Sequence, residues 1–245
     1  MAKPTILVVS GHAADFCSRS GGTIAKYVRE GCRVQIIALT FGERGESAYY
    51  WAQNPNSTIE AAKVQRKKEA LAAAEVLGAE IDFCDYDDHP LIMTGERITE
   101  LAMRIQDIRP DIVLTHWHHD PVNVDHGVTS SVVIRALSCA SVPGLQPGVK
   151  PHPLPDVFFF ESSVPHTEFN EFRIDTYVDI TETQAIKLEA LSKFTSQPFL
   201  AEWYTKYAEH RGHQAGNWTQ RTIKYAEGFK RYTPYVGSFF PLSER

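Results

Sequence analysis

Short apolar runs alternate along the chain with longer segments in which apolar residues recur at helical spacing. The predicted strands are Thr5–Ser10, Arg33–Thr40, Ile81–Tyr86, Asp111–His116, Pro155–Glu161 and Thr176–Ile180. The predicted helices are Gly21–Glu30, Thr58–Leu77, Thr94–Ile108, His126–Ala140 and Glu182–Phe194. Strands and helices that alternate in this way are typical of βα units. We therefore predict an α/β fold, a single Rossmann-like domain over residues 1–245, with a mainly parallel sheet flanked by helices.

The second half of the chain is less regular than the first. Residues 142–155 form a proline-rich segment, which we interpret as a loop over the active-site face rather than a domain boundary. Residues 197–222 form a polar and aromatic segment, whose aromatic residues Phe199, Trp203 and Tyr207 have the spacing of a buried or interfacial helix face. Both segments are candidates for a subunit interface, so a homo-oligomer is among the assemblies that this sequence allows.

Composition narrows the classes of partner. The chain has 43% hydrophobic residues, a mean hydropathy of −0.27 and no apolar run of membrane-spanning length, so we expect no membrane partner. A formal net charge of −5 gives no basic surface for nucleic acid. The four cysteines, Cys17, Cys32, Cys84 and Cys139, form no CxxC pair, and no secretory signal precedes the first strand. These features predict a cytoplasmic protein with reduced cysteines.

Polar residues gather where four of the predicted strands end. These segments are Gly11–Asp15, Thr40–Ser47, Tyr86–His89 and His116–Asp120. Ligands of open α/β sheets bind beyond the carboxyl ends of the strands. We therefore expect the functional site at this edge.

Three residues at this edge form a candidate metal site. His12 and Asp15 supply an imidazole and a carboxylate, and His126, at the start of the helix after the fourth strand, can complete an open set of three ligands. A lone histidine is more often an ordinary loop residue, but three such residues at neighbouring strand ends favour a metal. An alternative site on His116, His118 and His119 is weaker, because adjacent residues project in opposite directions.

These motifs resemble the zinc-dependent LmbE-like or PIG-L deacetylases, which act on N-acetylglucosamine conjugates. The segments that carry the resemblance are Gly11-His12-Ala13-Ala14-Asp15 for Ala-His-Pro-Asp-Asp, Thr40–Glu46 for Thr-x-Gly-Glu-x-Gly, Tyr86–Leu91 for Pro-Asp-Gly-x-Leu, and Asn123-Val124-Asp125-His126 for His-Pro-Asp-His. The resemblance runs in order over nearly the whole chain. It implies a metal-dependent catalytic domain with Zn²⁺ on His12, Asp15 and His126.

Two positions depart from the deacetylase pattern. Ala14 stands where those enzymes have the aspartate that acts as general base, and Asn123 stands where many have a histidine that stabilises the oxyanion. Loss of a general acid–base group typically costs about 10²–10⁴ in rate. The metal site without this base indicates either a different reaction or no reaction.

The departure at Ala14 is what one branch of the superfamily leads us to expect. Residues 4–16 and 41–47 resemble in more detail the 4-oxalomesaconate, or 4-carboxy-2-hydroxymuconate, hydratases of bacterial gallate and protocatechuate breakdown. This resemblance implies a zinc-dependent hydro-lyase that adds water to a carbon–carbon double bond and forms 4-carboxy-4-hydroxy-2-oxoadipate. The alternatives are a deacetylase of N-acetyl sugars with a displaced carboxylate base, and a metal-holding binding protein without catalysis.

Hydration needs groups that move protons. Glu46, in the glycine-containing loop after the second strand, is our candidate for one proton transfer. His166, after the fifth strand, is our candidate for the other. Asp125 is more suited to orienting a histidine. For Glu46 the alternative of a solvated loop glutamate carries equal weight.

A small polycarboxylate substrate also needs cations and hydrogen-bond donors. Arg44 and Arg211 are the candidate carboxylate clamps, since a guanidinium can bind a carboxylate through two hydrogen bonds. Glu43, His213 and Asn123 complete the predicted substrate-binding set. Surface salt bridges are the competing explanation for both arginines.

Overall fold

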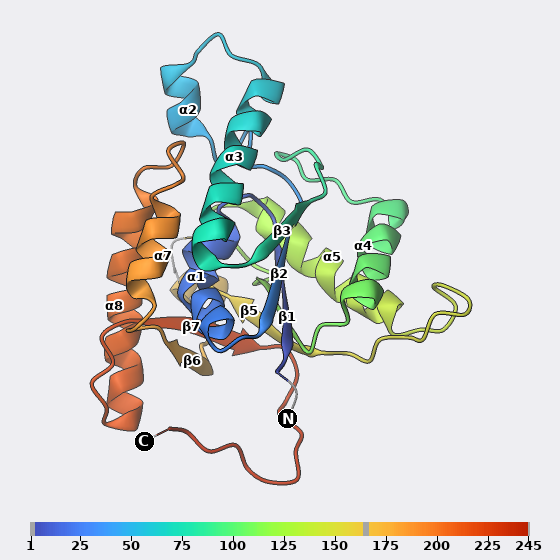
Figure 1. Ribbon diagram of the computed structural model, residues 1–245, viewed down its shortest axis with the longest axis vertical. Coiled ribbons are helices and arrows are strands. Elements are labelled where there is room, and N and C mark those ends of the chain that lie inside the picture. The colour runs from blue at the N-terminus through green and yellow to red at the C-terminus, as the bar shows by residue number, and fades with distance from the viewer. Residues whose placement is uncertain (1–2, 164–166, 245) are drawn as a thin grey trace.

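The protein is described by a computed structural model that covers residues 3–163 and 167–244. Within these residues one sheet of seven strands occupies the centre, in the order β3-β2-β1-β4-β5-β7-β6 (Figure 1). The strands are β1 (Thr5–Ser10), β2 (Arg33–Ala38), β3 (Glu80–Phe83), β4 (Ile112–His116), β5 (Asp156–Phe160), β6 (Thr176–Asp179) and β7 (Ala226–Arg231). β1 to β5 pair in parallel, and β7 runs antiparallel to β5 and β6. The predicted α/β domain with a mainly parallel sheet is confirmed.

Helices cover both faces of the sheet. They are α1 (Asp15–Arg29), α2 (Ala48–Gln53), α3 (Ile59–Leu77), α4 (Gly95–Ile108), α5 (Val124–Ala140), α6 (Thr167–Asn170), α7 (Gln184–Leu191) and α8 (Leu200–Thr219). Helices α1, α3, α7 and α8 lie on one face, whereas α4 and α5 lie on the other (Figure 1). No helix within the described ranges combines the length and apolar character needed to cross a membrane.

Local chemistry explains several of these elements. In β1 every residue from Ile6 to Ser10 is buried, as expected for a central parallel strand covered on both sides. Helix α3 begins where the Thr58 hydroxyl accepts a hydrogen bond from the Ala61 amide, and it ends at Gly78, whose φ of 72° is the left-handed conformation that glycine adopts readily.

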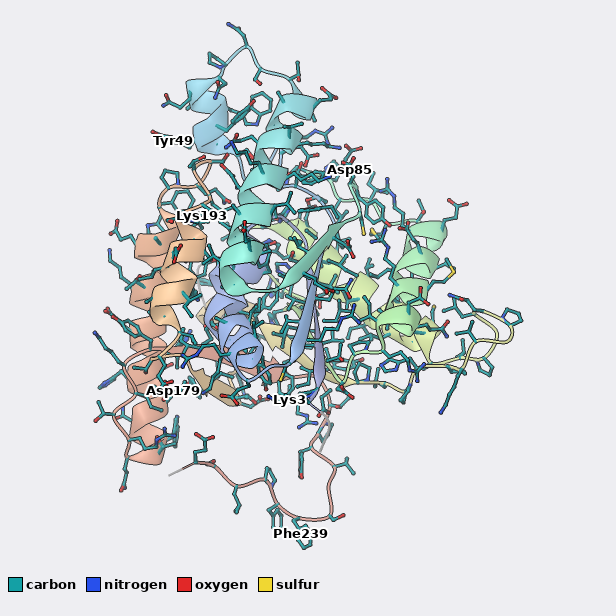
Figure 2. The ribbon with its side chains drawn as sticks, in the orientation of Figure 1. Lys3, Tyr49, Asp85, Asp179, Lys193 and Phe239 are labelled. Atoms are coloured by element: carbon teal, nitrogen blue, oxygen red, sulfur yellow. The ribbon has the colours of Figure 1, made fainter. Side chains whose placement is uncertain are left out.

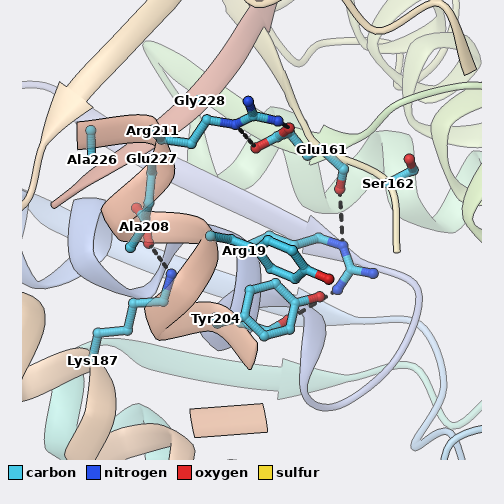
Figure 3. A pocket seen from close by; sticks show the side chains of 12 residues that line it. Arg19, Glu161, Ser162, Lys187, Tyr204, Ala208, Arg211, Ala226, Glu227 and Gly228 are labelled. Carbon is cyan, nitrogen blue, oxygen red and sulfur yellow. Dashed lines mark hydrogen bonds and ion pairs between the residues drawn. The ribbon is translucent and has the colours of Figure 1, made fainter. Parts of the chain in front are cut away.

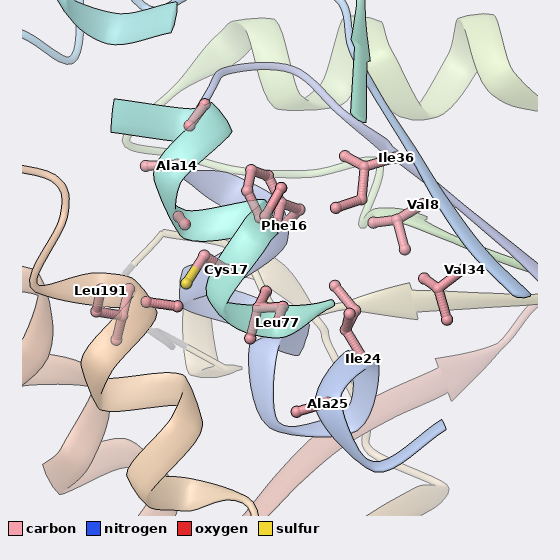
Figure 4. Packing of buried hydrophobic residues seen from close by; sticks show 14 of the residues in the cluster. Val8, Ala14, Phe16, Cys17, Ile24, Ala25, Val34, Ile36, Leu77 and Leu191 are labelled. Atoms are coloured by element: carbon pink, nitrogen blue, oxygen red, sulfur yellow. The ribbon is translucent and has the colours of Figure 1, made fainter. Parts of the chain in front are cut away.

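Two hydrophobic clusters hold the layers together. One joins β1 and β2 to α1, α3 and α7 and includes Val8, Phe16, Ile36, Leu77 and Leu191 (Figure 4). The other joins the opposite face of the sheet to α4 and α5. Each strand of the centre is thus fixed from both sides, which makes the strand ends a rigid support for side chains.

Some predicted boundaries are wrong. Helix α1 begins at Asp15 rather than at Gly21, and its first turns bury polar side chains such as Ser18 and Arg19, so the apolar periodicity that marks a helix is absent there. Helix α8 was indicated only by the helical spacing of aromatic residues within 197–222, and strand β7 was not predicted. β7 contains Glu227, Gly228 and Lys230, which disfavour strands, and it forms because two neighbours pair with its backbone.

The proline-rich loop lies at the amino ends of the strands, whereas the predicted site lies at their carboxyl ends. The prediction that this loop lies over the active-site face is therefore wrong. The amide of His152 donates to the Ala140 carbonyl, and its ring Nε2 contacts the carbonyl oxygen of Pro110, just before β4 begins. Arg109 also donates to the Lys150 carbonyl. The loop connects the end of α5 to the start of β5, which places it at the amino ends of the strands.

Candidate metal centre

The site lies where the strand order in the sheet reverses, since β2 and β3 follow on one side of β1 and β4 and β5 on the other. Strands β1 and β4 are neighbours, but α1 leaves β1 toward one face and α5 returns from β4 on the other. A crevice at the carboxyl ends of such strands is the usual ligand site of open α/β folds. His12 follows β1, Asp15 opens α1, and His126 lies in the first turn of α5.

The ligand atoms of these three residues converge. His12 Nδ1 lies 3.2 Å from Asp15 Oδ2 and 3.2 Å from His126 Nε2. Asp15 Oδ2 and His126 Nε2 are 3.5 Å apart. Ligands held tetrahedrally at about 2.0–2.2 Å from an ion lie about 3.3–3.6 Å from one another. Both the donor types and their spacing fit a divalent metal ion, and this group could hold one.

Glu46 lies beside the fourth position of this group. Its Oε1 atom is 3.3 Å from His12 Nδ1 and 3.6 Å from His126 Nε2. Burial and the negative charge of Asp15 act to raise the pKa of Glu46, but His12 and His126 together hold it at about 2. The Glu46 side chain is 13% exposed, whereas His12 and His126 have no exposed side-chain surface. These distances match the ligand spacing, so Glu46 belongs to the set of side chains that could hold the ion, and its partial exposure places it on the solvent side of that set.

Surrounding charges shift the pKa values of the ligands His12 and Asp15. Burial acts to lower the pKa of His12, but Glu46, Asp125 and Asp15 raise it well above its usual value. Burial acts to raise the pKa of Asp15, but Arg19, His126 and His116 hold this carboxyl well below its usual range. The histidines therefore sit in a field that favours positive charge. A divalent ion satisfies that field and competes with protons for the same atoms.

Two further carboxylates lie behind the histidine rings, and one of them forms a hydrogen bond with its ring. Nδ1 of His126 donates to Asp120 Oδ2 at 2.6 Å, and the same oxygen accepts from the Ser163 amide. Nε2 of His12 faces Asp125 Oδ2 at 3.7 Å. A carboxylate behind a ligating histidine fixes the orientation of its ring. The orienting role of Asp125 stays a prediction, since its oxygen lies beyond hydrogen-bond distance of His12 Nε2.

The loop that carries Glu46 approaches His12 closely. Gly42 has a φ of 71°, and a Cβ there would lie 3.2 Å from the Cβ of His12 and 3.1 Å from that of Glu46. The Asn123 side-chain amide donates to Glu46 Oε1 at 3.2 Å, and Asn123 Oδ1 caps α5 by accepting from the Asp125 amide. The loop and the start of α5 thus fix Glu46 from two sides.

Ala14 leaves no carboxylate at its position. Its side chain is 2% exposed and belongs to the hydrophobic cluster that includes Phe16 and Cys17 (Figure 4). Glu46, which belongs to a different loop, supplies the carboxylate near His12 and His126.

The remaining predicted site residues make their contacts outside the metal-ligand group. Arg44 binds the Asp88 carbonyl at 2.8 Å, and the buried Glu43 carboxylate lies 3.8 Å from Lys63, with its pKa raised by burial. Arg211 is paired with the Glu161 carboxylate, and His213 is exposed on α8. No hydrogen bond, ion pair or ring contact within the described ranges joins these four residues to the metal-ligand group. His166 lies outside the described residues.

Of the alternative histidines, one reaches the site. The His116 ring stacks on that of His126 with centroids 4.1 Å apart, and its Nε2 accepts from the Gly11 amide. Burial and the nearby His126 lower the pKa of His116 to about 3, so its ring is neutral. His118 and His119 are exposed.

Sequence reasoning missed Arg19 and the role of Asp120. The Arg19 guanidinium donates to Asp15 Oδ1 at 2.8 Å, to the Glu161 carbonyl at 3.1 Å and to Ser163 Oγ at 2.8 Å. Figure 3 shows it beside Tyr204 at one end of a cavity whose lining also includes the Arg211–Glu161 and Lys187–Glu227 pairs. The i,i+4 spacing of Asp15 and Arg19 is a signal of this contact, once a helix is known to begin at Asp15.

Comparisons with known proteins agree with this fold. The family model described as PIG-L, GlcNAc-PI de-N-acetylase, matches residues 7–137. The chain is 39% identical to a 4-oxalmesaconate hydratase of Pseudomonas putida over 234 residues, which is 94% of this chain and 90% of that protein.

Two further relatives show the range of the similarity. The crystal structure of GalB, the 4-carboxy-2-hydroxymuconate hydratase of Pseudomonas putida KT2440, superposes with a TM-score of 0.92 at 37% identity, covering 97% of this chain and 100% of that one. A 1D-myo-inositol 2-acetamido-2-deoxy-alpha-D-glucopyranoside deacetylase of Thermomonospora curvata is 29% identical over 56% of this chain and 54% of its own. The chain described here belongs to the PIG-L family.

Proposed function

We propose that the protein is a zinc-dependent hydratase that adds water to the double bond of 4-oxalomesaconate (4-carboxy-2-hydroxymuconate) to give 4-carboxy-4-hydroxy-2-oxoadipate. The observation that carries this proposal is the 39% identity to a 4-oxalmesaconate hydratase over nearly the full length of both chains. The similarity to a deacetylase is weaker and covers about half of each chain.

The geometry at Ala14 supports the same reaction. Amide hydrolysis needs a base that takes a proton from water and returns it to the leaving amine. A methyl group buried at 2% exposure can do neither. Hydration releases no amine, and it therefore has no need of this shuttle.

We assign Zn²⁺ to His12, Asp15 and His126, because two imidazoles and a carboxylate at tetrahedral spacing suit this ion. An ion held there would supply Lewis acidity toward a carbonyl oxygen of the substrate. Asp120 binds the ring of His126, and Asp125 lies behind the ring of His12.

The protons are moved by side chains in our scheme. Glu46 takes a proton from the attacking water, whose oxygen bonds to one carbon of the double bond. His166 gives a proton to the adjacent carbon. The position of Glu46 beside the ligand group supports its part; the part of His166 rests on the sequence alone.

Substrate carboxylates need cationic partners. Arg44 is our candidate, since its side chain is exposed on the loop that carries Glu46. Arg211 is already paired with Glu161, so a direct contact with substrate would require that pair to open. The four cysteines are free, in keeping with the cytoplasmic location that we propose.

Two assays on zinc-loaded protein test the proposal, each with a chelator control. One follows the ultraviolet absorbance of 4-carboxy-2-hydroxymuconate, and the other measures amine release from N-acetylglucosamine conjugates. We expect chelator-sensitive loss of absorbance and no amine. Amine release without hydration would overturn the proposal in favour of a deacetylase, and activity in neither assay would favour a binding protein.

The variant Ala14→Asp separates the two reactions. A deacetylase should gain hydrolytic rate when the carboxylate at this position is restored. For a hydratase we expect no amine release from the variant, and a lower hydration rate, because an added carboxylate would enter a buried site next to Asp15.

A further inference from the structure

One histidine beside the metal-ligand group has no part in the scheme so far. His89 lies in the loop between β3 and α4, and its ring centroid is 6.4 Å from that of His12. Its side chain is 43% exposed, whereas those of His12, Asp15 and His126 are 0–1% exposed. Glu46, at 13%, is the other part of this group that reaches solvent. His89 and Glu46 are therefore the side chains at this group through which a ligand in solvent can make contact.

Asp125 fixes the position of His89. Its Oδ2 atom accepts from the His89 amide at 2.8 Å and lies 3.2 Å from His89 Nδ1, and Oδ1 accepts from the Leu91 amide. The same Oδ2 atom faces His12 Nε2 at 3.7 Å, so one carboxylate lies between the two rings. With Nδ1 directed at Asp125, the Nε2 atom of the ring faces away from that carboxylate. Within the described part of the chain, no residue forms a hydrogen bond with this Nε2 atom.

The loop of Glu46 leaves space for the His89 ring. A Cβ on Gly45 would lie 2.5 Å from both Cε1 and Nδ1 of His89, so the ring packs directly on the backbone next to Glu46. The φ of His89 is 42°, a left-handed conformation that costs energy for a residue with a side chain. The contacts of Asp125 and Gly45 hold this side chain in place despite that cost.

We propose that His89 binds a carboxylate of the substrate through Nε2 and so contributes to the selection of polycarboxylates. With Nδ1 facing Asp125, Nε2 is the ring nitrogen left to face a substrate carboxylate, and a hydrogen bond to an anion is charge-assisted. This assignment rests on the proposed function and names a contact for the substrate class assumed there. It gives the site a hydrogen-bonding partner for the substrate beside Glu46, where Arg211 and His213 supply none.

Two substitutions separate the two ring nitrogens. In His89→Asn the side-chain amide can replace Nδ1 toward Asp125 but nothing replaces Nε2. In His89→Gln the amide reaches the place of Nε2 and the contact with Asp125 is lost. His210→Asn, an exposed histidine of α8, is the matched control.

The first readout is equilibrium binding of propane-1,2,3-tricarboxylate to zinc-loaded protein, measured by calorimetry. We expect His89→Asn to weaken binding roughly 10–100-fold, the range for a hydrogen bond to a charged group, with zinc content and Tm unchanged. His89→Gln should recover part of the affinity, and His210→Asn should bind as the wild type does. Equal affinity of His89→Asn and wild type would overturn the assignment. So would an affinity of His89→Gln no higher than that of His89→Asn, with a lowered Tm in both variants.

The second readout is steady-state hydration. A substrate-binding His89 raises KM in His89→Asn with little change in kcat, whereas a residue that only positions His12 through Asp125 would lower kcat and be rescued by Asn. If the wild type does not hydrate the substrate but His89→Asn still loses tricarboxylate binding, the proposed function fails and the assignment of His89 stands. If hydration is normal and binding is unaffected, the reverse holds.

Discussion

Glu46 combines two properties at the scale of a single residue. It lies within 3.3 Å of a metal-ligand nitrogen, and it keeps some contact with solvent. Asn123 and the Gly42 turn fix its carboxylate. This arrangement suits a group that handles the proton of a water molecule at the fourth position.

Glu46→Gln removes the acid–base group and keeps its size. We expect kcat for hydration to fall by about 10²–10⁴, the usual contribution of such a group. Zinc content should stay at the wild-type value, because His12, Asp15 and His126 are unchanged. Steady-state kinetics and metal analysis measure the two effects, with the exposed Glu96→Gln as control. Loss of the metal together with activity would show that Glu46 is a ligand.

Asp120 acts through His126. Asp120→Asn weakens the 2.6 Å contact with His126 Nδ1 and removes a charge that favours metal binding. We expect zinc affinity to fall about 10–100-fold, as is typical when the carboxylate behind a ligating histidine is lost. Competition with a chromophoric chelator measures the affinity, and the exposed Asp107→Asn is the control. An unchanged affinity would contradict this role.

At the scale of elements, α3 is joined to the segment after α7 through a buried carboxylate. Glu69 on α3 is 3% exposed, and its oxygens accept from Arg66, Thr195 and Ser196. Although burial acts to raise the pKa of Glu69, the hydrogen bond from Thr195, the charge of Arg66 and further hydrogen bonds lower it. The contact fixes α3 against the helices that cover one face of the sheet.

Glu69→Gln should destabilise the fold at pH 7 by on the order of 3 kcal/mol, because the buried Arg66 loses its carboxylate partner at 3.1 Å and keeps only Glu46, at 4.0 Å. A carboxyl whose pKa is lowered on folding contributes stability above its unfolded pKa and loses that contribution as the pH falls through the folded value. The difference between wild type and variant should therefore shrink on acidification below the ordinary glutamate pKa. Urea unfolding at several pH values tests this, with the exposed Glu75→Gln as control. A difference that does not depend on pH would contradict the argument.

At the scale of the whole molecule, the C-terminal segment leaves apolar side chains uncovered. Phe239, Phe240 and Leu242 are 85%, 93% and 94% exposed, and Figure 2 shows Phe239 well outside the folded body. Contiguous exposed apolar surface on a protein marks an interaction site. The homo-oligomer that the sequence allows remains a prediction, and this segment is where we expect its contacts.

Light scattering in solution tests the assembly. We expect a mass that is a multiple of 27.6 kDa for the full chain and a smaller assembly after residues 235–245 are removed. A full-length mass of one chain would contradict the prediction, and an unchanged assembly after truncation would move the interface elsewhere.

The sequence determined the parts of this protein that depend on local patterns. The apolar runs of β1 and β4 and the caps of α3 predict their elements, because burial on both faces and hydrogen bonds at helix ends act over a few residues. Parallel strands bring their carboxyl ends together, so His12, Asp15 and His126 could be placed at one edge.

Tertiary structure decided which polar residues share that edge. His12 and His126 meet across 114 positions, and Arg19 reaches Glu161 and Ser163 from the start of a helix that polar residues conceal. β7 forms only because β5 and β6 pair with it, and His89 stands beside His12 only because Asp125 binds its backbone. A buried polar group is stable only with a partner, and when that partner comes from a distant segment no local pattern can reveal it.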